Sequence, residues 1–161
     1  GLTKLPAEIG NLKKLETLNI ANSPIVELPA EIGQLESLSS IEIYNCPNLD
    51  KFPMAITQMS ELISLNISNN KQWVAEDILD GMRKLASGPA AEKIQILYAR
   101  QNNLPLLPKE FRKMKKLGLS LCFKCSCQCS TLTDCSTRNI RNFHLCQLCI
   151  DNGLINRNSH N

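Results

Sequence analysis

Apolar side chains return along most of the chain in one repeated frame. In its clearest copy Leu38, Ile41 and Ile43 stand at offsets 0, 3 and 5, followed by Cys46 at offset 8 and Leu49 at offset 11. The alternation at period two is typical of a short strand with one buried face. Offset 0 of the other copies is filled by Leu15, Leu62, Ile94 and Leu117. The sequence therefore predicts a stack of similar units.

A second pattern fills the stretch between one strand and the next. Apolar residues stand three apart there and follow a proline, as Ile9, Leu12 and Leu15 follow Pro6. This spacing predicts a helical turn that begins at the proline, because the fixed φ of proline suits a first helical position. The distance from Pro6 to Pro29 is 23 residues. Each unit is thus predicted to contain a strand, a turn and a short helix.

The third unit departs from this period, since Leu62 and Ile94 are 32 residues apart. Its added length carries apolar residues on one helical face, and Gly88 with Pro89 ends the pattern. These residues are Ala75, Ile78, Leu79, Met82 and Leu85. We expect a longer helix over about residues 73–87, with Trp73 packed at its start. As the only tryptophan, Trp73 has the alternative role of an anchor for a partner.

Together these residues resemble the leucine-rich repeat family in its 23-residue class, Leu-x-x-Leu-x-Leu-x-x-Asn-x-Leu followed by x-x-Leu-Pro-x-x-Ile. The resemblance covers residues 1–119. It implies an α/β fold, a right-handed solenoid arc with a parallel concave β-sheet and short convex helices. In this family the residue at offset 8 is Asn or Cys and closes backbone hydrogen bonds inside the turn. Asn70, Asn102 and Cys46 fit this role, so Cys46 is interpreted as structural, whereas Ser23 departs with Asn22 beside it.

Side chains that lie between the buried positions of a strand point to its other face. Stacked units would therefore present three rows on the concave side. The rows are Thr17, Ser40, Ser64, Ile96; Asn19, Glu42, Asn66, Tyr98; and Ala21, Tyr44, Ser68, Arg100. Tyr and Arg often dominate the binding energy of interfaces. We predict partner binding at Glu42, Tyr44, Tyr98 and Arg100, with a protein as the partner that the family implies. The alternative is that these are ordinary solvated strand positions.

Composition and charge exclude several other functions. A net charge of +3 over 161 residues does not require a polyanionic partner, and the basic residues of 109–116 alternate with apolar ones as on a solvated helix. No nucleic acid partner is expected. No apolar run is long enough to insert in a membrane. The chain starts with Gly1 inside a repeat, so we expect a fragment edge there.

Enzymatic chemistry has little support in the repeats. Residues 1–119 contain no His, so no Ser or Cys there has a His base in the same stack. A Gly-rich phosphate loop is also missing from the sequence. We therefore predict a chain without catalysis and without a cofactor.

The tail, residues 120–161, holds seven of the eight cysteines and leaves the apolar register. Cys122 and Cys125, with Cys146 and Cys149, form two Cys-x-x-Cys pairs that suit tetrahedral zinc, and His144 is a substitute ligand. In that case the tail would have a regulatory role, with the repeats as its presenting scaffold. A disulfide-stapled cap, as extracellular family members carry, is a second interpretation. The third is an out-of-frame translation, which would leave the tail disordered and without a selected function.

Overall fold

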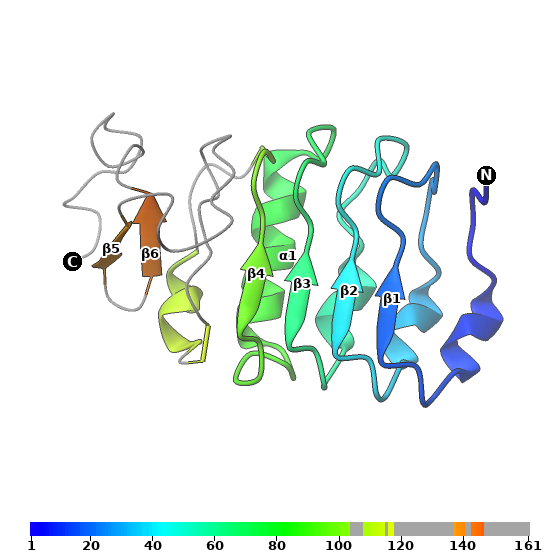
Figure 1. Cartoon of the computed structure of the whole chain (residues 1–161), viewed down its shortest axis with the longest axis horizontal. Coiled ribbons are helices and arrows are strands. Elements are labelled where there is room, and N and C mark those ends of the chain that lie inside the picture. Colours follow the sequence, from blue (N-terminus) through cyan, green and yellow to red (C-terminus); the bar gives the residue numbers. More distant parts are fainter. Residues whose placement is uncertain (104–107, 115, 118–136, 141–142, 147–161) are drawn as a thin grey trace.

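The structure is a computed structural model that describes residues 1–103, 108–114, 116–117, 137–140 and 143–146. Four three-residue strands form its main sheet: β1 (Thr17–Asn19), β2 (Ser40–Glu42), β3 (Ser64–Asn66) and β4 (Ile96–Tyr98). They lie side by side in sequence order, and every neighbouring pair is parallel. Figure 1 shows them as successive rungs along the length of the molecule.

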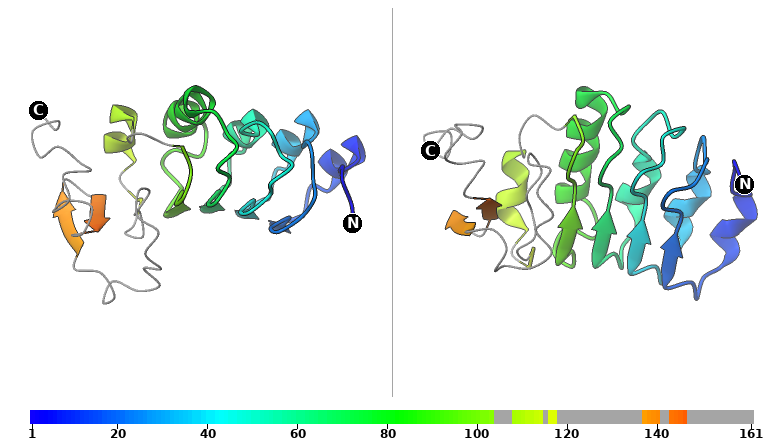
Figure 2. Two further views of the ribbon diagram at one scale, coloured as in Figure 1. Left: turned by 90° about the horizontal axis from the view of Figure 1, so that it is seen from above. Right: turned by 45° about the horizontal axis from the view of Figure 1, so that its top comes forward.

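Helical segments form the second layer, on the other side of the sheet (Figure 2). Four are short 3-10 helices: η1 (Ala7–Asn11), η2 (Ala30–Gln34), η3 (Met54–Gln58) and η4 (Lys109–Lys113). Each follows a proline directly, as the sequence pattern predicts, with Pro6 at φ −70° and Pro29 at φ −66°. The helices stack closely, since a Cβ on Gly33 would lie 2.9 Å from the carbonyl oxygen of Ala55.

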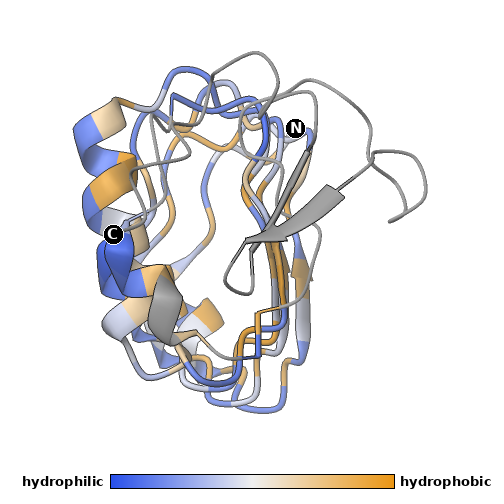
Figure 3. Cartoon of the chain, turned by 90° about the vertical axis from the view of Figure 1, so that its left-hand side faces the viewer, coloured by the Kyte–Doolittle hydropathy of each residue, from blue (hydrophilic) through white to orange (hydrophobic). Residues whose placement is uncertain are grey.

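Equivalent residues pair across the sheet, so the apolar side chains of successive units stack on one another. Leu18 pairs with Ile41, Ile41 with Leu65, and Leu65 with Leu97. Ile41, Leu65 and Leu97 are completely buried in one continuous core. Viewed along the stack in Figure 3, the coils superimpose around a single interior. The predicted solenoid, with parallel strands on one side and short helices on the other, is thus confirmed.

Burial of a leucine in this shared core should be worth several kcal/mol. Replacing Leu65 with Ala is expected to lower the free energy of unfolding by about 2–5 kcal/mol, because a cavity replaces contacts to both neighbouring units. Urea denaturation followed by tryptophan fluorescence measures the change. Replacing the preceding residue, Ser64, with Ala is the control, with an expected change within about 0.5 kcal/mol. A loss at Leu65 no larger than the loss at Ser64 would contradict the shared core.

The longer third unit contains the α-helix α1 (Ala75–Ser87), within the range that the sequence predicts. Trp73, just before it, is fully buried, and its indole nitrogen donates a 2.7 Å hydrogen bond to the carbonyl oxygen of Leu49. Its ring stands edge-on to the ring of Phe52, with centroids 5.4 Å apart. Trp73 is therefore a core residue, and its burial contradicts the alternative that it anchors a partner.

Asn70 closes the turn after β3 from inside the core. Its side-chain amide donates to the carbonyl oxygens of Ile43 (2.7 Å) and Ile67 (3.0 Å), and its Oδ1 accepts from the backbone N–H of Cys46 (2.9 Å). Asn70 has no exposed surface. Three backbone groups that water cannot reach are thereby satisfied, and two adjacent units are joined.

Cys46 fills the same slot one unit earlier. Its Sγ donates to the carbonyl oxygen of Ile20 at 3.2 Å, and the residue is buried with a free thiol. The structural interpretation of Cys46 is confirmed. Asn102 repeats the arrangement in the next unit, where its Oδ1 accepts from the backbone N–H of Asn70 at 2.8 Å. The hydroxyl of Ser23 lies 4.0 Å from the Cys46 Sγ and makes no comparable backbone bond among the described residues.

Within the tail, β5 (Thr137–Ile140) and β6 (Phe143–Cys146) pair as an antiparallel hairpin. The predicted domain boundary after residue 119 lies outside the described residues, so it stays a prediction.

Candidate interaction surface

The face of the sheet turned away from the helices carries the three predicted rows of side chains. Strand pairing aligns Ser40 with Ser64 and Glu42 with Asn66, and backbone hydrogen bonds beyond the strands continue the register to the third row. Every residue of the rows is exposed or half-buried. The alignment of the rows is therefore as expected from the sequence. Whether they bind a partner stays a prediction.

The β4 end of this surface combines three different chemistries in one line. Ile96 is 40% exposed, and Tyr98 and Arg100 follow it at alternate positions along the chain. The Arg100 guanidinium carbon lies 5.5 Å from the centroid of the Tyr98 ring, within the range of a cation–π interaction. The backbone N–H of Arg100 donates to the hydroxyl of Ser68 at 3.1 Å. The line thus offers an apolar, an aromatic and a cationic group along β4 and the turn that follows it.

A chain of side-chain amides runs along the edge of the surface and ends at Tyr44. Asn69 Nδ2 donates to Asn45 Oδ1 (3.1 Å), Asn45 Nδ2 donates to Asn22 Oδ1 (2.7 Å), and Asn22 Nδ2 donates to the Tyr44 hydroxyl (3.3 Å). We call Asn22, Asn45 and Asn69 the outer amide ladder. All three residues have φ between 54° and 57°, a left-handed conformation that Asn tolerates better than most residues.

Sequence reasoning missed the outer amide ladder, although a signal for it exists. Asn stands at offset 7 in three successive units, directly before the residue that closes each turn. Asn in that position of a turn is typical of a left-handed residue. The bonds between the amides follow only from the spacing of the units, which the sequence does not give.

Glu42 lies in the middle row, on the face opposite the core. Its neighbours across the sheet are Asn19 and Asn66, whose Oδ1 atoms accept from the backbone N–H groups of Ala21 (2.9 Å) and Ser68 (3.1 Å). Glu42 is half-buried, and within the described ranges its carboxylate has no hydrogen bond and no salt bridge. This carboxylate is thus held among neutral groups.

Other carboxylates of the repeats pair with lysines at the equivalent position of the adjacent unit. These pairs are Lys4 with Glu27 (2.7 Å), Lys13 with Glu36 (3.3 Å) and Glu61 with Lys93 (2.6 Å). The Lys93 ammonium hydrogen-bonds and attracts the Glu61 carboxylate, which lowers the pKa of Glu61 from its usual value. All are exposed, so each contributes little to stability. At these three positions, stacked units place opposite charges face to face.

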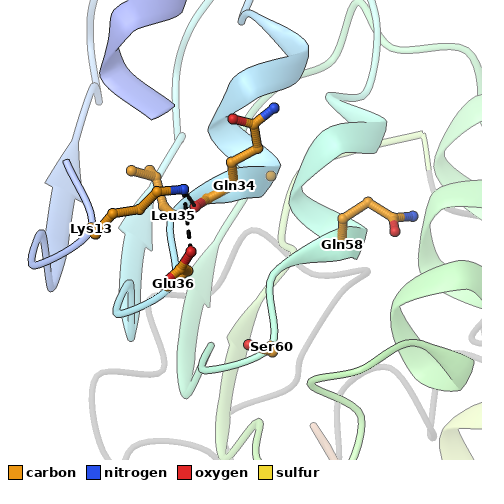
Figure 4. Close-up of a pocket in the computed structure, with 7 residues that line it drawn as sticks. Lys13, Gln34, Leu35, Glu36, Gln58 and Ser60 are labelled. Carbon is orange, nitrogen blue, oxygen red and sulfur yellow. Dashed lines mark hydrogen bonds and ion pairs between the residues drawn. The ribbon is translucent and has the colours of Figure 1, made fainter. Parts of the chain in front are cut away.

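A shallow hollow of about 260 Å³ lies away from the three rows, beside η2 (Figure 4). Lys13 lies in it and is already engaged, because its Nζ is 2.9 Å from the carbonyl oxygen of Gln34 and 3.3 Å from Glu36 Oε1. The other lining residues are Gly33, Leu35, Gln58 and Ser60. The hollow offers no base beside a nucleophile and no strong reason to bind a ligand.

The zinc site is one alternative for the tail, and most of its candidate ligands lie outside the described residues. Cys146 lies in β6, but Cys122, Cys125 and Cys149 lie outside the described part of the chain. Within that part, no three His, Cys, Asp or Glu side chains gather to hold a metal ion. The zinc and disulfide interpretations of the tail therefore stay predictions. In the same residues, no helix has the length and apolar character to cross a bilayer.

Comparison with known proteins gives the class to which this fold belongs. A family model for a leucine-rich repeat region matches residues 1–153 of the sequence. The chain therefore belongs to the leucine-rich repeat family. No curated protein matches the sequence significantly.

Solved structures agree with this assignment. A leucine-rich repeat protein from Bacteroides eggerthii is 30% identical with a TM-score of 0.67, covering 76% of this chain and 24% of its own. One from Bacteroides thetaiotaomicron is also 30% identical, with a TM-score of 0.66 and coverage of 76% and 17%. The chain thus spans less than a quarter of either relative. The plant peptide hormone receptor RGFR1, in complex with RGF2, has the same fold at 22% identity, a TM-score of 0.53 and coverage of 72% and 18%.

Proposed function

We propose that this chain is a non-catalytic interaction module whose concave sheet face binds a protein partner. The proposal rests on the separation of the side chains of each strand into a buried face and an open face. The central aliphatic residue of each strand packs in or against the shared core, while two tyrosines, one arginine, one carboxylate and the exposed Ile96 stand with small side chains on the open face. Members of the leucine-rich repeat family commonly mediate protein–protein interactions, and the plant receptor RGFR1 was solved in complex with RGF2.

The rigidity of the sheet favours binding. Its strands are paired and packed before a partner arrives, so little conformational entropy is lost when the complex forms. Tyr98 and Arg100 support one another through the cation–π contact, which holds two long side chains in place. Aromatic and arginine side chains with this preorganisation are the type that dominates binding energy at interfaces. We assign them as the main contacts, with Glu42 and Tyr44 beside them.

The test is the affinity of a partner for a variant of the main contacts. Partners are first captured through a photo-crosslinking residue in place of Ser64, at the centre of the face, and are then purified. Replacing both Tyr98 and Arg100 with Ala is expected to weaken binding at least thirtyfold, equivalent to about 2 kcal/mol. Isothermal titration calorimetry measures the dissociation constants.

The matched control places the same number of alanines outside the three rows, at the exposed residues Glu8 and Lys14. This control should bind as the unchanged chain does. A partner that loses no affinity when Tyr98 and Arg100 are replaced would contradict the proposal. The repeats would then serve as a spacer between other parts of a larger protein.

A further inference from the structure

Glu42 is the carboxylate of the three concave rows, and its neighbours differ from those of the carboxylates that pair between units. Glu27, Glu36 and Glu61 each face a lysine of the adjacent unit. Glu42 instead faces Asn19 on one side and Asn66 on the other, and it has no salt bridge within the described ranges. A half-buried carboxylate that no protein cation neutralises is still available to attract the cation of a ligand. The middle of the concave face therefore presents a single unsatisfied negative charge.

Tyr44, the next residue of the same face, has a defined hydrogen-bonding state. Its hydroxyl oxygen accepts from Asn22, and the Oδ1 of Asn22 is occupied by the amide of Asn45. The atom of Asn22 that faces the Tyr44 hydroxyl is its amide nitrogen, which donates and does not accept, so Asn22 does not take the phenolic proton of Tyr44. A hydroxyl has one proton to give, so the outer amide ladder leaves Tyr44 to donate it toward the open face. Tyr44 is a hydrogen-bond donor there, beside the acceptor Glu42.

We propose that Glu42 and Tyr44 form a subsite for a basic residue, Lys or Arg, of a polypeptide partner, with Asn22 as the positioning residue. This inference rests on the proposed function and specifies the chemistry of the partner. Glu42 pairs with the ammonium or guanidinium group, and Tyr44 donates to a backbone carbonyl of the same segment. Residues two apart along a strand lie about 7 Å from each other, which a long basic side chain spans from its charged end to its own backbone.

The charge of the rest of the molecule makes this preference testable. The chain carries a net charge of +3, so non-specific attraction would favour acidic peptides over basic ones. A preference for basic peptides must therefore arise locally. Arg100, the cation of the face, stands two strands away from Glu42. A partner that lies across β2, β3 and β4 meets the negative charge first and the positive charge last.

The experiment uses two capped decapeptide libraries, one with Arg fixed at the centre and one with Glu, and all other positions randomised. Retention on the immobilised chain is measured at physiological salt. We expect at least tenfold higher retention of the Arg library, and loss of most of this preference in the Glu42→Gln variant. Glu8→Gln removes the same charge from an exposed position of η1 and should leave the preference intact.

Positioning by Asn22 is tested separately. Gly tolerates the left-handed conformation of Asn22, so Asn22→Gly removes the amide without backbone strain. It should weaken Arg-library retention by about the twofold to tenfold that one hydrogen bond is worth, as Tyr44→Phe should. In the Tyr44→Phe background, Asn22→Gly should have no further effect, which a merely structural role would not produce. Thermal denaturation of each variant confirms that the fold is kept.

The outcomes separate this inference from the proposed function. Equal retention of both libraries, or a preference that Glu42→Gln leaves unchanged, overturns the basic subsite. Retention that disappears when Tyr98 and Arg100 are replaced still supports binding on the concave face in that case. Failure of the chain to retain the Arg library at all overturns the inference as well.

Discussion

Replacing Asn70 with Asp is expected to lower the free energy of unfolding by about 4 kcal/mol or more. The substitution keeps the shape of the side chain and the acceptor for the Cys46 N–H. It removes the two donors that satisfy the carbonyl oxygens of Ile43 and Ile67. It also places a carboxylate at a site with no exposed surface. A buried acceptor without its donor costs about 1–3 kcal/mol, and an unpaired buried charge costs about 3–5 kcal/mol.

Urea denaturation measures this loss, and the single buried Trp73 supplies the fluorescence signal. Asn48→Asp, at an exposed position, introduces the same change of charge and should alter stability by less than about 0.5 kcal/mol. Burial raises the pKa of the introduced carboxyl above that of the unfolded chain. The loss should therefore be largest above this raised pKa and shrink as the pH falls through it, since protonation restores one donor. An Asn70→Asp variant as stable as Asn48→Asp would contradict the account of the turn.

A further destabilising effect is expected at Gly81, inside α1. Replacing an interior helical Gly with Ala usually stabilises a protein by about 1 kcal/mol. Here a Cβ on Gly81 would lie far inside contact distance of Cε1 of Phe52. Phe52 cannot easily retreat, because its ring is buried and packs against Trp73. We expect Gly81→Ala to destabilise the fold by about 1–3 kcal/mol, as overpacked cores do.

A double-mutant cycle isolates the cause of this loss. Phe52→Leu makes room beside the helix, so Gly81→Ala should cost at least about 1 kcal/mol less in that background. Arg83→Ala, at an exposed position of the same helix, controls for changes in helix propensity. The measurement is the midpoint of thermal unfolding for the four members of the cycle. A rise of this midpoint in the Gly81→Ala single variant would show that the helix does not rest on Phe52.

The repeated strand and helix of each unit could be predicted from the sequence because they depend on the regular spacing of apolar residues and prolines. The offsets around Leu38 predict a strand, and the prolines predict where each 3-10 helix begins. The turn residues Cys46 and Asn70 follow from the family resemblance. The contact between Phe52 and Gly81 could not be predicted in this way, since it joins two units whose separation is set by the irregular third period.

The candidate site also has a part that the sequence predicts and a part that it does not. The three rows follow from alternation along each strand and the repeated register, so Glu42 and Tyr98 could be placed on one face from the sequence. The bond from Asn22 to Tyr44 could not, because it joins side chains of different units. Its existence depends on how closely the coils stack, which the core decides. The functional detail therefore lies mainly between units.

In the described sheet, β2 and β4 are both hydrogen-bonded to β3 and not to each other. A ligand that spans β2 to β4 would therefore connect two strands that are not paired with each other. Clamping them together would slow amide hydrogen exchange in all three strands at once, including in β3 where few side chains need meet the ligand. The number of successive strands whose amide hydrogen exchange slows would show how many strands the ligand covers.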